Sequence, residues 1–170
     1  MMRFFLIKRK CRIKHIKREV DIVQLCEEAG GFSQTRIAES SLEKQLLSLL
    51  KQVAKEIFGD FFENYPTCRV IENDSCSHQG MALLQKRDSK VNNSMGHQFR
   101  YRLTQIEIKK SLLEKECFSE AFAVYCHELC HCFGADASAA FSYSLTDAMS
   151  LMVSHVECLQ DYQQKWIACF

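Results

Sequence analysis

No long hydrophobic run is present in this 170-residue sequence. The apolar run from Phe4 to Ile7 is too short for the hydrophobic region of a secretory signal peptide. No later run approaches the roughly 20 apolar residues that a transmembrane helix needs. The sequence therefore predicts neither secretion nor a membrane-spanning segment, and we expect the protein in the cytoplasm.

Several short motifs of enzyme families are missing as well. The sequence contains no glycine-rich phosphate-binding loop, no G-x-S-x-G motif, no internal repeat and no low-complexity tract. A glycine-rich loop brings backbone N–H groups onto phosphates, and the G-x-S-x-G turn exposes a nucleophilic serine. These absences give no support to a nucleotide-binding protein or to an enzyme with a serine nucleophile.

The chain does contain enough apolar residues for a folded core. Hydrophobic residues make up 47% of the sequence, and a chain of this length suits one domain. The net charge of +1 conceals an asymmetry, because residues 1–18 contain eight basic residues and no acidic residue. We therefore divide the chain into a basic N-terminal segment of unassigned structure, residues 1–40, and a folded domain, residues 41–170.

The basic segment allows three interpretations. It is compatible with a tail that binds nucleic acid or a membrane surface, with an organelle transit segment, or with a solvated start of the chain. No aromatic interleaving and no binding motif accompany the charges. We favour the solvated segment over a role in nucleic-acid binding.

The ten cysteines would suit a disulfide-linked scaffold if the chain were short and secreted. Because no export signal is found and the core is large, we expect reduced thiols instead. Cys68, Cys76 and His78 lack a fourth partner and the regular spacing of a zinc site. We assign these three residues to packing.

Local signals predict one helix and a small sheet in the first half of the domain. A capping box formed by Ser40 and Glu43 begins a helix over residues 41–58, and Gly59 ends it. Turn-rich clusters separate short strands near residues 67–71, 80–84 and 98–108. Further along, residues 138–170 contain no glycine or proline and have the pattern of one long amphipathic helix. This order of elements predicts an α+β fold.

The residues with the clearest chemistry follow the last strand, where His127, Glu128 and His131 form the pattern H-E-x-x-H. Two imidazoles four residues apart on a helix can bind one zinc ion while the glutamate beside them acts as a base. At about 100° per residue, both histidines lie opposite an apolar stripe that we expect to be buried, and Glu128 flanks them. The stripe consists of Phe122, Tyr125, Cys126, Leu129 and Phe133.

Neighbouring residues favour a metal site over a solvated polar helix face, which is the alternative interpretation. Ser119 is the expected N-cap of the helix, and Gly134 is its expected C-cap. Cys126, Cys130 and Cys132 lie on the same helix but point in different directions from the two histidines. We therefore do not expect these cysteines to share an ion with the imidazoles.

His127, Glu128, His131, Gly134 and Asp136 together resemble the short-spaced form of the zincin (H-E-x-x-H) metallopeptidases. In that form a glycine after the second histidine turns the chain back, so that a third ligand reaches the zinc. The resemblance covers about residues 99–150 and implies a small twisted sheet packed over the active-site helix. It also implies that His127, His131 and Asp136 bind Zn²⁺, that Glu128 is the general base, and that a peptide or protein substrate pairs with an edge strand.

The third ligand is where the sequence departs from the family pattern. The usual third ligand follows the second histidine by six residues, whereas Asp136 follows it by five. We predict that a left-handed Gly134 returns Asp136 to the zinc. The rival ligand is His155, near the edge of the apolar stripe of the C-terminal helix, where it also suits a core histidine. Asp147 is a candidate to orient a ligand, and Glu157 is expected in solvent.

These observations predict a zinc metallopeptidase, which is a hydrolase of peptide bonds. The alternative is a noncatalytic, zinc-stabilised module with a regulatory or interaction role, as part of a larger system. A nucleic-acid binder that acts through residues 1–18 is the third hypothesis.

Overall fold

The computed structural model describes residues 35–36, 39–72 and 79–170, which lie in the compact unit Gln34–Phe170. The basic segment 1–18, Cys76 and His78 fall outside the described residues. The elements follow in the order β1 (Thr35–Arg36), α2 (Ser41–Phe58), β2 (Thr67–Glu72), β3 (Gly80–Asn92), β4 (Gln98–Lys109), the 3₁₀-helix η1 (Lys110–Leu112), α3 (Phe118–Cys130), α4 (Ala139–Ser154) and α5 (Val156–Ile167). This part of the chain therefore has the predicted α+β composition. Among its helices, none combines the length and the hydropathy that a bilayer span requires.

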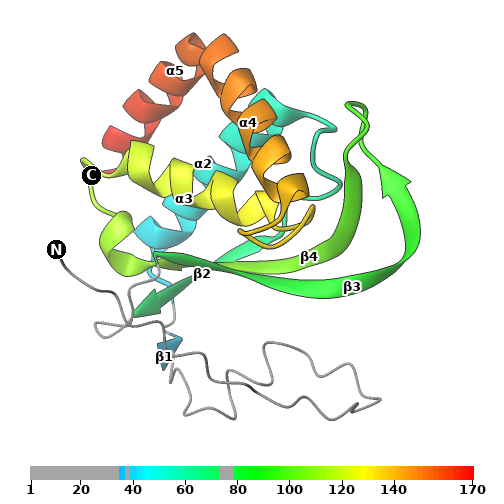
Figure 1. Ribbon diagram of the computed structural model, residues 1–170. Helices are drawn as coiled ribbons and strands as arrows, with labels where there is room; N and C mark the ends of the chain where they lie inside the picture. Colours follow the sequence, from blue (N-terminus) through cyan, green and yellow to red (C-terminus); the bar gives the residue numbers. More distant parts are fainter. Residues whose placement is uncertain (1–34, 37–38, 73–78) are drawn as a thin grey trace, which may run out of the picture. The chain divides into compact units, whose positions relative to one another are not determined.

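The strands form a mixed sheet in the order β1-β2-β4-β3. Strand β2 runs parallel to β4, whereas β3 is antiparallel to β4 and β1 is antiparallel to β2. Ile106 of β4 pairs with Cys68 of β2 on one side and with Ala82 of β3 on the other. Helices α2 to α5 lie over one face of this sheet (Figure 1). Within the described residues, β3 is thus the edge strand beyond β4.

The local signals for α2 and the strands are confirmed. Oγ of Ser40 accepts the backbone N–H of Glu43 at 3.2 Å, and the Glu43 carboxylate accepts the backbone N–H of Ser40 at 2.6 Å. Gly59 caps the end of α2 with a positive φ of 52°. The expected strands are found, although β3 continues to Asn92, eight residues past its predicted end.

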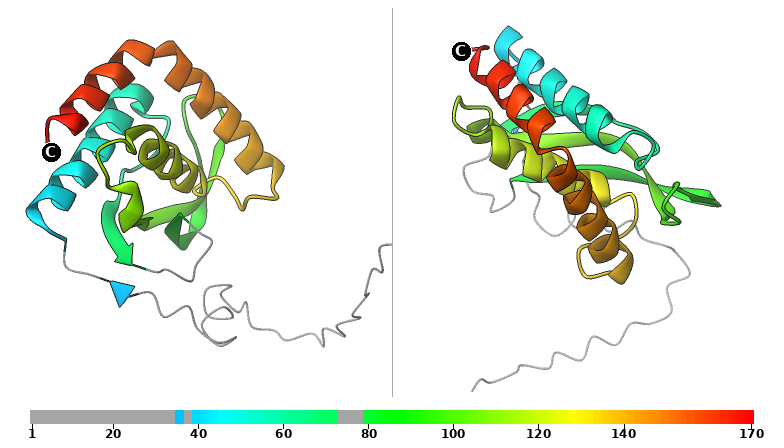
Figure 2. Two further views of the ribbon diagram at one scale, coloured as in Figure 1. Left: turned by 90° about the vertical axis from the view of Figure 1, so that its left-hand side faces the viewer. Right: turned by 90° about the horizontal axis from the view of Figure 1, so that it is seen from above.

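The C-terminal segment differs from the prediction, because it forms two helices and not one. The chain breaks at His155, which has φ −120° and ψ 33°, and whose Nδ1 lies 2.8 Å from the carbonyl oxygen of Leu151. Figure 2 shows α4 and α5 meeting at an angle. The break lets α5 return along α2, where Tyr162 donates to the Glu56 carboxylate at 2.9 Å. Long-range packing therefore overrides a continuous helical pattern.

Aromatic rings fill the space between the sheet and the helices. Phe58 of α2 stacks on Phe122 of α3 with ring centroids 6.2 Å apart, and Phe133 stacks on Phe99 of β4 at 5.0 Å. All five residues of the apolar stripe predicted for α3 are buried, with at most 3% of their surface exposed. The prediction of the buried side of α3 is therefore confirmed, and the opposite side carries the histidines.

Candidate metal centre

Helix α3 carries both histidines near its C-terminal end. It begins at Phe118 with Cys117 as the N-cap residue, so the prediction of Ser119 as N-cap is wrong. The ring of Phe118 is buried and stacks on Phe122 at 6.0 Å. Including Phe118 in the helix buries this ring against the next turn, which favours the earlier start.

Three predicted ligands lie together at the end of α3. The donor atoms of His127, His131 and Asp136 all lie within 4.8 Å of one another. Oδ1 of Asp136 is 3.2 Å from Nε2 of His127 and 3.5 Å from Nε2 of His131. A carboxylate oxygen and two imidazole nitrogens thus converge, which is the donor chemistry that Zn²⁺ accepts in proteins.

The turn after α3 returns Asp136 to the histidines, but not in the predicted way. The C-cap of α3 is His131 and not Gly134, and Gly134 does not have a positive φ. A Cβ atom at position 134 would lie only 2.2 Å from Oγ of Ser138. Both predictions about Gly134 are therefore wrong, since this glycine leaves room for Ser138 and does not supply a left-handed turn.

Ser138 connects this turn to helix α4. Its Oγ accepts the backbone N–H of Phe141 at 3.2 Å, which caps α4. The ring of Phe141 then lies against both imidazoles, with centroid distances of 5.0 Å to His127 and 4.9 Å to His131. The amphipathic pattern of residues 138–170 did not predict this contact of Phe141 with the two histidines.

The backbone holds one ring nitrogen of His131. Nδ1 of His131 lies 3.2 Å from the carbonyl oxygen of Gly134, so a proton on Nδ1 is donated to that oxygen. Nε2 then carries the lone pair and faces Asp136. Burial lowers the pKa of His131, which favours the neutral imidazole that binds metals.

Glu128 is buried beside the ligand group. Only 6% of its surface is exposed, and its Oε2 lies 3.7 Å from Nε2 of His131. Burial raises the pKa of Glu128 to about 7, and the negative charge of Asp136 acts in the same direction. A backbone hydrogen bond from Ala82 of β3 opposes this shift. The sequence placed Glu128 beside the histidines but did not predict its contact with β3.

Other candidate residues lie apart from the group. Nδ1 of His155, the rival ligand, is hydrogen-bonded to the carbonyl oxygen of Leu151 at the α4–α5 break. His155 is not among the clustered donors. Oδ2 of Asp147 lies 2.6 Å from Nε2 of His97. Asp147 therefore connects α4 to the β3–β4 hairpin and does not have its predicted role of orienting one of the clustered donors. Glu157 is exposed, as expected.

The cysteines of α3 and of the turn after it take no part in the donor group. Cys126, Cys130 and Cys132 are free and buried. Burial raises the pKa of all three thiols, and the pKa of Cys130 reaches about 12. None of the three sulfur atoms is among the clustered donor atoms, so these buried side chains act as packing residues.

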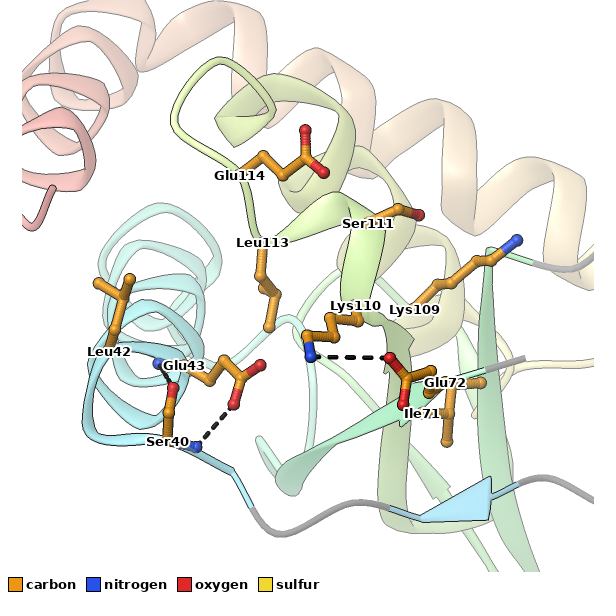
Figure 3. Close-up of a pocket in the computed structure, with 10 residues that line it drawn as sticks. All are labelled: Ser40, Leu42, Glu43, Ile71, Glu72, Lys109, Lys110, Ser111, Leu113 and Glu114. Carbon is orange, nitrogen blue, oxygen red and sulfur yellow. Dashed lines mark hydrogen bonds and ion pairs between the residues drawn. The ribbon is translucent and has the colours of Figure 1, made fainter. Parts of the chain in front are cut away.

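Two hollows in the described part lie away from the histidines. The first lies between the start of α2, the end of β2 and η1, and an ion pair of Lys110 with Glu72 at 3.6 Å crosses it (Figure 3). The second is an apolar groove between α3 and the helices α4 and α5, lined among others by Phe122, Met152 and Leu159. Neither is lined by the ligand group, whose Asp136 side chain is 70% exposed.

Comparisons with known proteins give no independent assignment. No family model, no curated protein and no solved structure matches this chain. The functional argument therefore depends on the geometry of the residues around α3.

Proposed function

We propose that this protein is a zinc-dependent peptidase of the zincin type. The observation that supports this proposal most directly is the placement of Glu128, which is buried 3.7 Å from His131 while the donor atoms of His127, His131 and Asp136 converge beside it. A solvated polar helix face would leave a glutamate in water. Here a base with a raised pKa lies next to a group of metal donors, as metal-assisted hydrolysis requires.

The donor group fits zinc. Two imidazole nitrogens and one carboxylate oxygen are the ligands of many catalytic zinc sites, which keep a fourth position open. The hydrogen bond from His131 to the Gly134 carbonyl oxygen fixes the ring in the way that bound histidines usually are. Zinc, when bound, would supply Lewis acidity toward a peptide carbonyl and would lower the pKa of water to about 7.

Glu128 would move the proton in this reaction. Its carboxylate accepts a proton from the attacking water and then donates it to the nitrogen of the leaving amine. A glutamate beside the metal suits both transfers, because its carboxylate can accept a proton and release it again in each catalytic cycle. The substrate would be an extended peptide, since β3 is an edge strand of the described sheet and lies next to α3, where a peptide could be added as a further strand.

Metal content and a single substitution test the proposal. We expect purified protein to contain one zinc per chain, and Glu128→Gln to retain this zinc while hydrolysis of a fluorogenic peptide library falls about 10²- to 10⁴-fold. His127→Ala should lose the zinc. The proposal fails if the wild-type protein binds no stoichiometric zinc, or if Glu128→Gln hydrolyses peptides as fast as the wild type.

A noncatalytic zinc-stabilised module is the second candidate. It is favoured by the exposure of Asp136 and by the position of the two hollows, neither of which is lined by the donor group. In that case zinc would raise the stability of the fold, and Glu128→Gln would change neither the zinc affinity nor the affinity for any partner. Peptide hydrolysis that depends on Glu128 excludes this candidate.

A further inference from the structure

The edge strand β3 touches helix α3 at its first residue, Gly80. The φ of Gly80 is not positive, so the backbone conformation does not demand a glycine. A Cβ atom at this position would lie 2.6 Å from Cγ1 of Val124 in α3. Val124 is β-branched and sits inside a helix, where such side chains have almost one rotamer. Gly80 is therefore required by the close approach of the strand to the helix.

The space left by the missing side chain also borders Glu128. A Cβ atom at position 80 would be 3.1 Å from Cγ and 3.2 Å from Oε1 of Glu128. Two residues further along β3, the backbone of Ala82 donates a hydrogen bond to the Glu128 carboxylate. The carboxylate is thus enclosed between β3 and α3, with its other oxygen 3.7 Å from Nε2 of His131.

We propose that Gly80 is a positioning residue for Glu128. Because it has no side chain, β3 lies directly on α3, and the Ala82 N–H holds the carboxylate beside the histidines. This inference rests on the proposed function, in which Glu128 transfers the proton. A side chain at position 80 would move either the strand or the carboxylate, and a misplacement of about 1 Å can cost about 100-fold in rate.

The chain offers a matched rescue for this substitution. Gly80→Ala adds the Cβ atom that meets Val124, and Val124→Ala removes Cγ1, the atom it meets most closely. We expect Gly80→Ala to lower kcat about 10- to 100-fold with little change in KM, because substrate binding is retained while the base is displaced. The double variant Gly80→Ala/Val124→Ala should recover kcat to within about threefold of Val124→Ala alone.

Zinc content and the thermal midpoint are measured for all four proteins, because a merely structural role would change them together with kcat. We expect one zinc per chain throughout, and a crystal structure of Gly80→Ala with the Glu128–His131 distance lengthened beyond 3.7 Å. The inference is overturned if Gly80→Ala keeps the wild-type kcat, if it loses zinc along with activity, or if Val124→Ala does not restore the rate. A wild-type protein that binds zinc without hydrolysing peptides overturns the proposed function and this inference together, whereas an active wild type with an equally active Gly80→Ala overturns the inference alone.

Discussion

Helix α3 packs one side against aromatic rings from distant parts of the chain. Its other side holds two imidazoles that contact the turn just after the helix, and a carboxylate that contacts β3. On the first side, Phe118 meets Trp166 of α5 at 5.7 Å and Phe122 meets Phe58 of α2 at 6.2 Å. On the second side, Asp136 reaches both histidines within 3.5 Å.

The two sides depend on different forces. Burial of apolar rings is non-directional and needs no partner beyond the chain itself. The second side gathers groups whose charges and lone pairs must be oriented, and it buries a carboxylate at a cost in stability. Fold stability and metal binding should therefore respond to different substitutions, and the following predictions test this separation.

The largest expected effect is on the aromatic side. Phe122→Ala should lower the free energy of unfolding of the zinc-free protein by about 3–5 kcal/mol, because a buried ring is replaced by a cavity. Phe170→Ala is the matched control, since Phe170 is 52% exposed and its removal should cost about 0.5 kcal/mol or less. Urea unfolding measures both. If both variants lost the same free energy of unfolding, packing on the aromatic side of α3 would not be the main source of stability.

The next effect concerns Glu128 and has the opposite sign. Burial raises its pKa from 4.5 to about 7, so the folded state favours the protonated form. Between these values the native protein binds more protons than the unfolded chain, and its stability falls as the pH rises. In zinc-free protein, Glu128→Gln should therefore be more stable than the wild type, by roughly 3 kcal/mol above pH 7 and by much less near pH 4.5.

Urea unfolding of the zinc-free protein from about pH 5 to about pH 8 measures this difference. Glu157→Gln is the control, because Glu157 is exposed and its replacement should give no pH-dependent gain. A stability difference between wild type and Glu128→Gln that stays constant across this range would contradict the burial of a titrating carboxylate.

Two substitutions test the side of α3 that carries the histidines, because each removes a possible third zinc ligand. Asp136→Ala should weaken zinc binding at least about 100-fold, because even groups that only orient a ligand account for about 10- to 100-fold. His155→Ala should leave the zinc affinity nearly unchanged, since His155 contacts Leu151 and lies outside the donor group. Competition with a chromophoric chelator gives both affinities. The reverse order would transfer the third ligand to the α4–α5 break.

The smallest effect is expected for a polar contact that belongs to neither side of α3. Asp147→Asn removes the charge that faces His97, on an aspartate whose side chain is 39% exposed. Partly exposed ion pairs contribute about 0.2–1 kcal/mol, so unfolding should become easier by that amount at most. Zinc affinity should stay the same, and a large loss of affinity would show that α4 depends on this contact to hold Phe141 in place.

The sequence predicted those parts of the molecule that depend on neighbouring residues. The capping box of α2 and the apolar stripe of α3 are local patterns, and the structure contains both. The break at His155 was not predictable in this way, because no glycine or proline marks it. It depends on distant contacts such as the hydrogen bond from Trp166 Nε1 to the Glu114 carbonyl oxygen at 2.9 Å.

The candidate site likewise has one part that the local sequence predicts and another part that it does not predict. The histidines and Glu128 could be placed from helical spacing alone, and Asp136 from a turn expected nearby. The enclosure of Glu128 by Gly80 and Ala82 could not, because it requires a strand more than forty residues earlier to lie on the helix. A strand that begins with two small residues out of three, Gly80 and Ala82, is the one signal that pointed to close packing.

The three donor residues span only ten positions of the chain, from His127 to Asp136. An unfolded chain therefore still holds two imidazoles and a carboxylate at a high effective concentration, and it would chelate zinc weakly if the native chain binds zinc as proposed. Because any affinity of the unfolded state subtracts from the stabilisation that a ligand gives to the native state, zinc should raise the thermal midpoint by less than its native affinity alone implies. If zinc is bound as proposed, the same compactness would allow the ion to be captured on a nascent chain before α5 has been synthesised.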